Sequence, residues 1–258
     1  MMRRITGSRQ VGLARALSKL GYCSRSQAAT LIRAGRVRLN GATRRDPETH
    51  VHLERDRIEV DLDVVTAESK IYLMLNKPRG VVTTASDEKG RQTVYSLLDK
   101  KVPWVGPIGR LDKASEGLLL LTNDSEWAAR ISDPDSHVDK TYHAQVGSAG
   151  RESLTDALLS GTRSGAELLR AKRARVLRSG EKNTWLEIVL DEGRNRQIRR
   201  MFEPLGIEVL RLIRVAIGPL ALGQLAKGQS RALSAAERFA LDQIIKISRG
   251  QARILEKG

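Results

Sequence analysis

The sequence predicts an α+β fold made of two parts, a short basic domain at residues 11–62 and a larger domain at residues 70–258, with a linker at residues 63–69. Two observations lead to this prediction. The first part changes from helical spacing of apolar residues to strand-like alternation over a short stretch. The second part contains many alternating segments with helices between them, which indicates an antiparallel or mixed sheet.

Two short helices are expected at the start of the small domain. Leu13 and Leu17 lie on one face of a helical pattern that Gly21 would end. Ser24 then precedes Gln27 by three residues, which is the capping-box pattern of a second helix. The domain therefore begins with a helix–helix pair.

A β-hairpin is expected to follow these helices. Residues 36–39 alternate charged and apolar side chains, and Asn40-Gly41 is the strongest short signal for a two-residue hairpin turn. A further strand is expected at residues 57–60. Six arginines lie around this helix–hairpin surface: Arg25, Arg33, Arg36, Arg38, Arg44 and Arg45. Their planar guanidinium groups match phosphate oxygens, whereas the alternative is a solvated face without a ligand.

The larger domain alternates between strand and helix patterns. Its predicted strands are residues 71–75, 81–84, 117–122, 141–146, 173–177, 184–190 and 207–215. Its predicted helices are residues 124–132, a basic helix at 195–205, and a closing helix that Ser234 and Glu237 cap and that runs to about Ser248.

The charge of the chain indicates a polyanionic partner. The 45 lysines and arginines outnumber the 30 aspartates and glutamates, for a formal net charge of +15. Such a charge repels itself unless a partner neutralises it. Nucleic acid is the first candidate. An acidic membrane surface is the second, but no basic amphipathic helix with bulky apolar residues is evident.

The cysteine and histidine content narrows the location and the chemistry. Cys23 is the only cysteine, so no intramolecular disulfide can form, and a reducing, cytoplasmic setting is expected. The four histidines do not combine with Cys23 in any metal-ligand spacing, so no metal site is expected. No apolar run reaches 18 residues, and no membrane span is expected.

A polar loop before an apolar strand carries the clearest candidate for chemistry. Asp112 lies between Gly109 and Gly117, and apolar residues follow at 118–121. A carboxylate on a loop that a buried strand holds is well placed for catalysis. Loop aspartates are also common caps and turn residues, so the residues alone leave both readings open.

Two stretches of sequence resemble known families. The segment SRSQAATLIRAGRVRLNG, residues 24–41, resembles a small RNA-binding domain first known from a ribosomal protein of the small subunit. Such domains usually carry a basic residue before the first helical leucine, where this chain has Gly12. The segment GRLDKASEGLLLLTND, residues 109–124, closely resembles the signature of the RsuA/RluB/RluE/RluF group of ribosomal RNA pseudouridine synthases.

Three further segments resemble motifs of the same group, in the same order. They are MLNKPRGVVTT at residues 74–84, Lys140-Thr141-Tyr142, and EGRNRQIRRMF at residues 192–202. The resemblance covers roughly residues 11–235. It implies a catalytic domain on a mixed, mostly antiparallel sheet with a cleft across it, and site-specific isomerisation of a uridine in ribosomal RNA. The third motif and the LRLIRVAIG that follows resemble the large-subunit members more closely, and a small-subunit target is the alternative.

The resemblance makes Asp112 the catalytic carboxylate. The reaction breaks the bond from ribose C1′ to uracil N1, turns the base and rejoins it through C5. A carboxylate can attack C1′ or stabilise the cation-like sugar, as in glycosidases. It can instead remove the 2′ proton to give a glycal, and the sequence does not choose between these routes.

The resemblance also assigns partners to Asp112. Tyr142 would stack on the flipped base, and Ile198 would pack against the uracil from the other side. Arg199 would pair with Asp112 and hold it ionised. A different helix phase would assign this pairing to Arg196.

The remaining implied residues contact RNA or support the loop. Arg110 is expected to contact phosphate, Arg194 and Arg196 to face RNA, and Lys77 to bind RNA backbone or support the active-site loop. No cofactor is expected, because the isomerisation changes neither redox state nor atom count. The implied partner is ribosomal RNA within a ribosome assembly intermediate, bound by a monomer.

Two other classes of protein compete with this interpretation. A non-catalytic ribosome- or RNA-binding factor would use the basic surface, but it has no use for an aspartate, a tyrosine and an arginine together. A methyltransferase would need a cofactor loop, and no G-x-G-x-x-G follows a strand.

Overall fold

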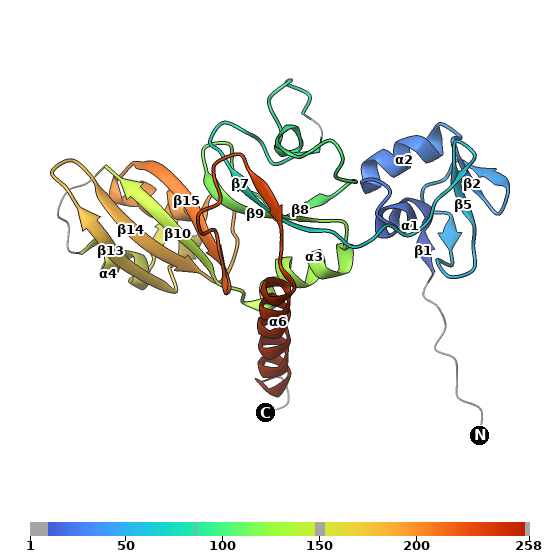
Figure 1. Cartoon of the computed structure of the whole chain (residues 1–258). Helices are drawn as coiled ribbons and strands as arrows, with labels where there is room; N and C mark the ends of the chain where they lie inside the picture. Colours follow the sequence, from blue (N-terminus) through green and yellow to red (C-terminus); the bar gives the residue numbers. More distant parts are fainter. Residues whose placement is uncertain (1–9, 86, 148–152, 256–258) are drawn as a thin grey trace. The chain divides into compact units, whose positions relative to one another are not determined.

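The computed structural model describes residues 10–85, 87–147 and 153–255 (Figure 1). They form two compact units. The small unit comprises the described residues up to Ile71 together with 99–106 and 122–126, and the large unit comprises 72–98, 107–121 and the described residues from 127 onward.

The small unit has the expected helix–helix–hairpin order. Its elements are β1 (Val11–Gly12), α1 (Leu13–Lys19), α2 (Arg25–Arg33), β2 (Val37–Leu39), β3 (Ala42–Arg44), β4 (His50–Val51), β5 (Ile58–Val60) and β6 (Asp63–Val64). Four of the strands form a sheet in the order β3-β2-β5-β6, and β1 pairs with β4. The leucines of α1 are fully buried against this sheet, as their spacing predicts.

Local signals explain the bounds of these elements. The Ser24 hydroxyl accepts from the Gln27 amide at 3.1 Å while the Gln27 side chain accepts from the Ser24 amide at 3.0 Å, which confirms the capping box. Asn40 and Gly41 both have positive φ, at 52° and 81°, as the tight β2–β3 turn requires. Residues 63 and 64 of the expected linker form β6, which pairs with β5, and the boundary at residue 62 stays a prediction.

The large unit is built on one long sheet. Its strands are β7 (Tyr72–Lys77), β8 (Gly106–Ile108), β9 (Glu116–Thr122), β10 (Lys140–Val146), β13 (Arg173–Ser179), β14 (Thr184–Leu190), β15 (Val209–Ile217), β16 (Leu220–Ala221) and β17 (Ser230–Ala232). Their order is β13-β14-β10-β15-β9-β7-β17, with β16 on β15 and β8 on β9. The β9–β15 pair is parallel, and β10 pairs antiparallel with both β14 and β15, which confirms the mixed, mostly antiparallel sheet.

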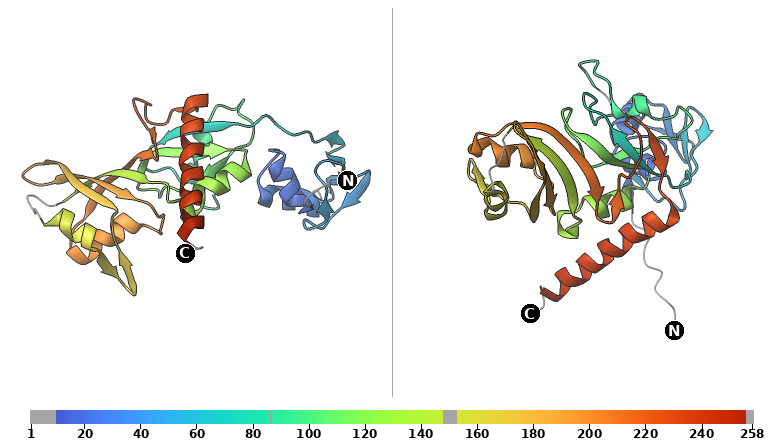
Figure 2. Two further views of the ribbon diagram at one scale, coloured as in Figure 1. Left: turned by 90° about the horizontal axis from the view of Figure 1, so that it is seen from below. Right: turned by 60° about the vertical axis from the view of Figure 1, so that its left-hand side comes forward.

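Helices cover parts of this sheet. They are α3 (Ser125–Ser132), α4 (Leu154–Ser160), α5 (Gln197–Phe202) and α6 (Ala235–Leu255). The 3-10 turns are η1 (Val94–Leu97), η2 (Pro134–Ser136) and η3 (Glu203–Leu205). A separate hairpin is formed by β11 (Thr162–Ser164) and β12 (Glu167–Leu169). One core joins α4 and α5 to β10, β14 and β15, and a second joins α3 and α6 to β7 and β9. The C-terminal helix α6 projects beyond the sheet (Figure 2). None of the described helices has the length and apolarity needed to cross a bilayer.

Several predicted elements differ from the structure in extent. The closing helix, for example, runs to Leu255 rather than to about Ser248. Residues 81–84 form no strand, and only an isolated bridge joins Val82 to Thr93. The Thr83 hydroxyl in this segment donates to the carbonyl oxygen of Leu111 at 2.8 Å. The basic helix starts at Gln197 rather than residue 195, because Arg196 has a left-handed φ of 49°. It ends as an α-helix at Phe202 and continues to Leu205 as a 3-10 turn.

Some short elements had no sequence signal that we recognised. They are β8, α4, the β11–β12 hairpin, β16 and β17. Apart from the seven-residue helix α4, each has two or three residues, which is too few to show the periodicity of a strand.

Candidate active site

The loop that carries Asp112 runs from β8 to β9 and is held from below by a buried lysine. The side chain of Lys77 is fully buried at the end of β7 and donates to the carbonyl oxygens of Pro78 at 3.1 Å, Asp112 at 3.1 Å and Ser115 at 2.8 Å. Burial is the main cause that lowers the pKa of this lysine to about 8. Of the two roles predicted for Lys77, these contacts correspond to support of the loop, and its side chain is not among those that line the pocket.

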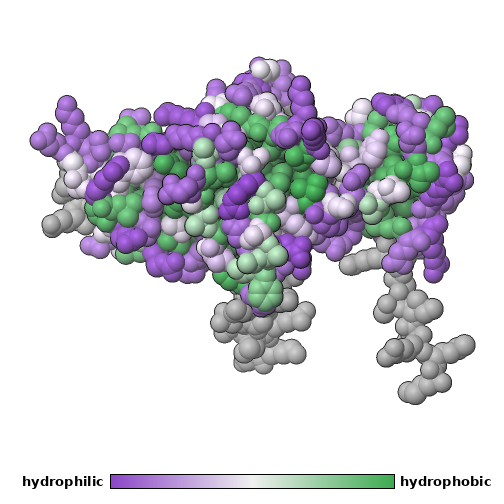
Figure 3. Space-filling view, viewed as in Figure 1, coloured by the Kyte–Doolittle hydropathy of each residue, from purple (hydrophilic) through white to green (hydrophobic). Residues whose placement is uncertain are grey.

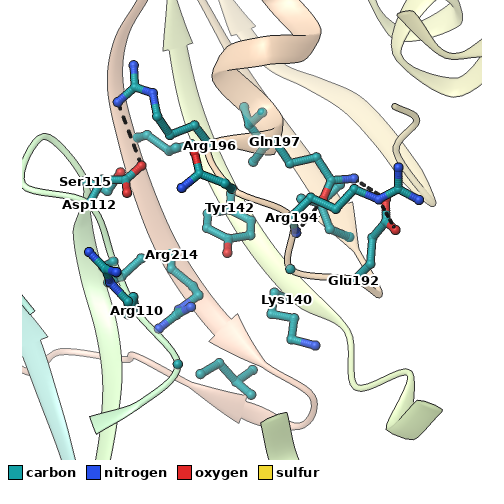
Figure 4. Close-up of a pocket in the computed structure, with 18 of the residues that line it drawn as sticks. Arg110, Asp112, Ser115, Lys140, Tyr142, Glu192, Arg194, Arg196, Gln197 and Arg214 are labelled. Atoms are coloured by element: carbon teal, nitrogen blue, oxygen red, sulfur yellow. Dashed lines mark hydrogen bonds and ion pairs between the residues drawn. The ribbon is translucent and has the colours of Figure 1, made fainter. Parts of the chain in front are cut away.

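A pocket of about 450 Å³ opens beside this loop in the large unit. This volume lies in the range of small-molecule sites, which suits one nucleotide base with its sugar. The pocket brings together seven of the predicted site residues (Figure 4): Asp112, Tyr142, Arg199, Arg110, Ile198, Arg194 and Arg196.

Arg196, and not Arg199, is the arginine that forms an ion pair with Asp112. The Arg196 Nη1 and Asp112 Oδ2 atoms are 4.0 Å apart, and both side chains are partly exposed. Arg199 instead donates from Nη1 to the carbonyl oxygen of Val209 at 2.8 Å and from Nη2 to that of Ala114 at 3.3 Å. The prediction that Arg199 pairs with Asp112 is thus wrong for this structure, and the alternative that we left open is the one formed.

The pKa shift and the hydrogen bonds of Arg199 are consistent with a residue that supports the Asp112 loop. Burial is the largest cause that lowers its pKa, and the neighbouring charge of Arg196 lowers it further, while Asp112 raises it. Its bond to the Ala114 carbonyl ties α5 to the loop two residues after Asp112. Arg196 and Arg199 therefore act on the same loop from different sides.

Tyr142 and Ile198 form the apolar part of the pocket. Tyr142 lies on β10 and packs against the core beneath α5, and its ring points into the pocket (Figure 4). Ile198, in the first turn of α5, is almost fully buried and lines the same pocket. An aromatic face opposite an aliphatic side chain is suited to hold a flat base between them.

Arg194 and Arg110 occupy the rim. Arg194 donates from Nε to Glu192 at 2.8 Å, and its Nη1 lies 3.4 Å from Glu167, so its charge is balanced by two carboxylates. Glu192 is fixed in turn by the side-chain amide of Gln197. Arg110 is exposed on the loop two residues before Asp112.

Two further cations in the pocket were not predicted as site residues. Lys140 and Arg214 both line it. Lys140 shares the face of β10 with Tyr142, because side chains two apart on a strand point to the same side. Arg214 lies beside Tyr142 in the pairing of β10 with β15, which the sequence does not reveal.

The six arginines predicted to bind RNA lie on the small unit, and all are exposed. Arg36 is bonded to Asp61, and Arg45 donates to the carbonyl oxygen of Arg33 at 3.0 Å. On the face drawn in Figure 3, hydrophilic side chains are interspersed with apolar ones. In the described parts of the chain, no group of three His, Cys, Asp or Glu side chains is arranged to hold a metal ion.

This fold and site define an enzyme with a carboxylate, a tyrosine and arginines around a base-sized pocket, joined to a separate basic domain. Comparisons with known proteins identify the family of this enzyme. The RNA pseudouridylate synthase family model matches residues 71–204, and the S4 domain model matches residues 11–58. The chain belongs to the RNA pseudouridine synthases and carries an S4 RNA-binding domain.

Relatives and solved structures agree with this assignment. The chain is 37% identical to the ribosomal large subunit pseudouridine synthase B of Bacillus subtilis, over 86% of this chain and 91% of that protein. It is 37% identical to an uncharacterized RNA pseudouridine synthase of Aquifex aeolicus, over 88% of this chain and 92% of that protein. A crystal structure of a pseudouridylate synthase superposes with a TM-score of 0.62 at 32% identity, covering 90% of this chain and 99% of that one.

Proposed function

We propose that this chain converts one uridine of large-subunit ribosomal RNA into pseudouridine and that Asp112 is the reacting carboxylate. The observation that supports this most is the meeting of Asp112, Tyr142 and Arg196 in one pocket, on three elements far apart in the sequence. The similarity to the Bacillus subtilis enzyme, whose name specifies the large subunit, supports the choice of RNA.

We assign a role to each side chain around the target base. Tyr142 and Ile198 hold the flipped uracil between them, since stacking on an aromatic ring compensates about 1–3 kcal/mol of the stacking lost from the RNA. Arg196 orients Asp112 toward the ribose through their ion pair. Arg199 keeps the loop in place through the Ala114 carbonyl. Asp112 then attacks C1′ or removes the 2′ proton, which frees the base to turn.

Charged residues outside the pocket would hold the RNA around the target. Arg110, exposed at the rim, would bind a phosphate next to the flipped nucleotide, and Arg194 would do so by exchanging a carboxylate partner for the phosphate. The six exposed arginines of residues 11–62 bind the flanking RNA, with residues 63–69 as the connection to the catalytic domain. We further propose that the enzyme works as a monomer in the cytoplasm on a ribosome assembly intermediate, where the target uridine is still accessible.

Pseudouridine mapping tests this function directly. Ribosomal RNA is sequenced from cells that lack the protein and from the same cells complemented with wild type, Asp112→Asn or Asp156→Asn. Asp156 is an exposed aspartate on α4 and serves as the matched control. We expect one large-subunit pseudouridine to disappear in the deletion and to return with wild type and with Asp156→Asn only. If Asp112→Asn also restores it, or if no site changes, the chain is a non-catalytic RNA-binding factor.

A further inference from the structure

Arg199 and Arg214 both line the pocket and each has a buried guanidinium nitrogen without a hydrogen-bond partner among the described residues, and Arg214 is the more deeply buried of the two. It is only 6% exposed, and its Nε donates to the carbonyl oxygen of Leu118 at 2.7 Å. Its Nη2 atom is also buried, yet it has no hydrogen-bond partner among the described residues. A buried guanidinium nitrogen without an acceptor is rare in proteins and calls for an explanation. Because Arg214 lines the pocket, a bound ligand can supply an acceptor to its guanidinium group.

Lys140 places a second cation beside Arg214. It lines the same pocket, and burial is the main cause that lowers its pKa, with the charge of Arg214 as the next cause. Asp139 and Asp191 act in the opposite direction. In Figure 4, Arg214 and Lys140 lie on either side of Tyr142, on the opposite side of the ring from Arg196. This end of the pocket is therefore a positively charged wall, formed by one buried and one half-buried cation.

The carboxylates of the pocket do not neutralise this wall. Glu192 is bonded to Arg194 and to Gln197. Asp112 lies nearest to Arg196. The structure thus leaves positive charge at the place where the base of a flipped nucleotide would sit, and a neutral uracil gives no reason for it.

The reaction itself supplies a negative charge at this place. When the bond between C1′ and N1 breaks, its electron pair stays on the uracil, and the resulting anion spreads its charge over N1, O2 and O4. The ring then turns, C5 uses an electron pair to bond to C1′, C5 loses its proton, and N1 takes up a proton. This balance is the same whether Asp112 attacks C1′ or first generates a glycal. Catalysis gains most from preorganised donors at atoms where charge develops.

We propose that Arg214 is a further catalytic residue, whose guanidinium group donates to a carbonyl oxygen of the uracil and stabilises the detached uracil anion while it turns, with Lys140 as its partner. The inference rests on the proposed function of the pocket. It differs from the role of Asp112, because Arg214 acts on the base and not on the ribose.

The test compares two leaving groups in single-turnover reactions. RNA that contains the mapped target site carries either uridine or 5-fluorouridine at that position, and the loss of the starting nucleoside is measured. Fluorine makes the detached base a weaker base, so its anion needs less stabilisation by the protein. The variants are Arg214→Gln and Arg214→Lys, and the control is Arg175→Gln, an exposed β13 residue paired with Glu187.

We expect Arg214→Gln to lower the rate on uridine RNA by on the order of 10²-fold, with little change in RNA affinity. The loss should be several-fold smaller on 5-fluorouridine RNA, and Arg214→Lys should recover part of the rate. Equal losses on both substrates, or a weakened RNA affinity that accounts for the whole effect, would overturn the proposal in favour of a structural role.

Two further results distinguish failure of this inference from misfolding of a variant and from failure of the proposed function. Lys140→Met removes the second cation without breaking the Arg214–Leu118 bond, and it should show the same dependence on the leaving group. If it shows none while the variant remains folded, the paired-cation proposal is wrong. Failure of the proposed function itself is recognised differently, because wild type would then consume neither substrate.

Discussion

The guanidinium group of Arg211 donates two hydrogen bonds to the carboxylate of Glu116, from Nε at 2.7 Å and from Nη2 at 3.0 Å. Lys227 adds a third contact at 2.7 Å, and the Glu116 side chain is only 5% exposed. Glu116 begins β9, directly after the loop that carries Asp112, and Arg211 lies on β15. The pair therefore joins the two parallel strands at the foot of the active-site loop.

This pair predicts a specific sensitivity to acid. The hydrogen bond from Arg211 is the main cause that lowers the Glu116 pKa to about 2, from an ordinary value of 4.5. A carboxyl group with a lowered pKa in the folded state stabilises the protein above its unfolded pKa and loses this effect as the pH falls toward the folded one. The stabilisation is therefore complete above about pH 5 and fades between pH 4.5 and 2. Its upper limit is about 3 kcal/mol.

The measurement is urea unfolding of wild type and Glu116→Gln across this pH range. The difference in free energy of unfolding should be largest at neutral pH and should shrink below pH 4.5. Glu203→Gln, at an exposed position after α5, is the control and should show little difference at any pH. A difference that stays constant down to pH 2 would contradict the assignment.

The second prediction concerns Gly117, the residue after Glu116. It has a φ of +102°, and a Cβ atom there would lie 2.8 Å from the amide nitrogen of Arg214 and closer still to its carbonyl oxygen. Because backbone cannot move aside as a side chain can, Gly117→Ala should destabilise the protein by about 3 kcal/mol or more. Gly193→Ala meets no atom within 4 Å and should change stability by less than about 1 kcal/mol. Comparable unfolding midpoints for both variants would refute this reading.

These contacts show which features the sequence could predict. The capping box at Ser24 and the turn at Asn40-Gly41 depend on neighbouring residues only, and both were predicted correctly. The strand predicted at 81–84 does not form, and Thr83 in this segment bonds instead to Leu111, 28 residues away along the chain. No local pattern carries that information.

The sequence motifs predicted which residues lie in the site, but not all of the contacts between those residues. Asp112 and Tyr142 were named from the motifs that carry them, and they do meet in one pocket. The choice between Arg196 and Arg199 depended on one backbone angle, the left-handed φ of Arg196, which delays the helix by two residues. Arg214 entered the pocket only through its register with Tyr142 on the neighbouring strand.

The third prediction separates Arg196 from Arg199. Arg196→Met removes the ion pair with Asp112 at the surface of the pocket, so kcat should fall by on the order of 10²-fold while the unfolding midpoint stays near that of wild type. Arg199→Met leaves the carbonyls of Val209 and Ala114 without their donor, which should also destabilise the fold by about 1–3 kcal/mol. Activity and urea unfolding of both variants check this. If Arg196→Met is nearly as active as wild type, the ion pair has no part in the reaction.

The last prediction tests the arginine surface of the small unit. In the part of the chain that the structure describes, Arg25, Arg38 and Arg44 form no ion pair, whereas Arg36 is bonded to Asp61. Each phosphate contact releases counterions, so its loss flattens the dependence of log K on log salt by roughly 0.7–0.9. The triple variant Arg25→Gln, Arg38→Gln, Arg44→Gln should therefore reduce the slope by about 2 to 3 and weaken binding most at low salt. Arg36→Gln should change it less, because its charge is already balanced. RNA titrations at several salt concentrations give these slopes, and a triple variant with the wild-type slope would show that the RNA does not bind this surface.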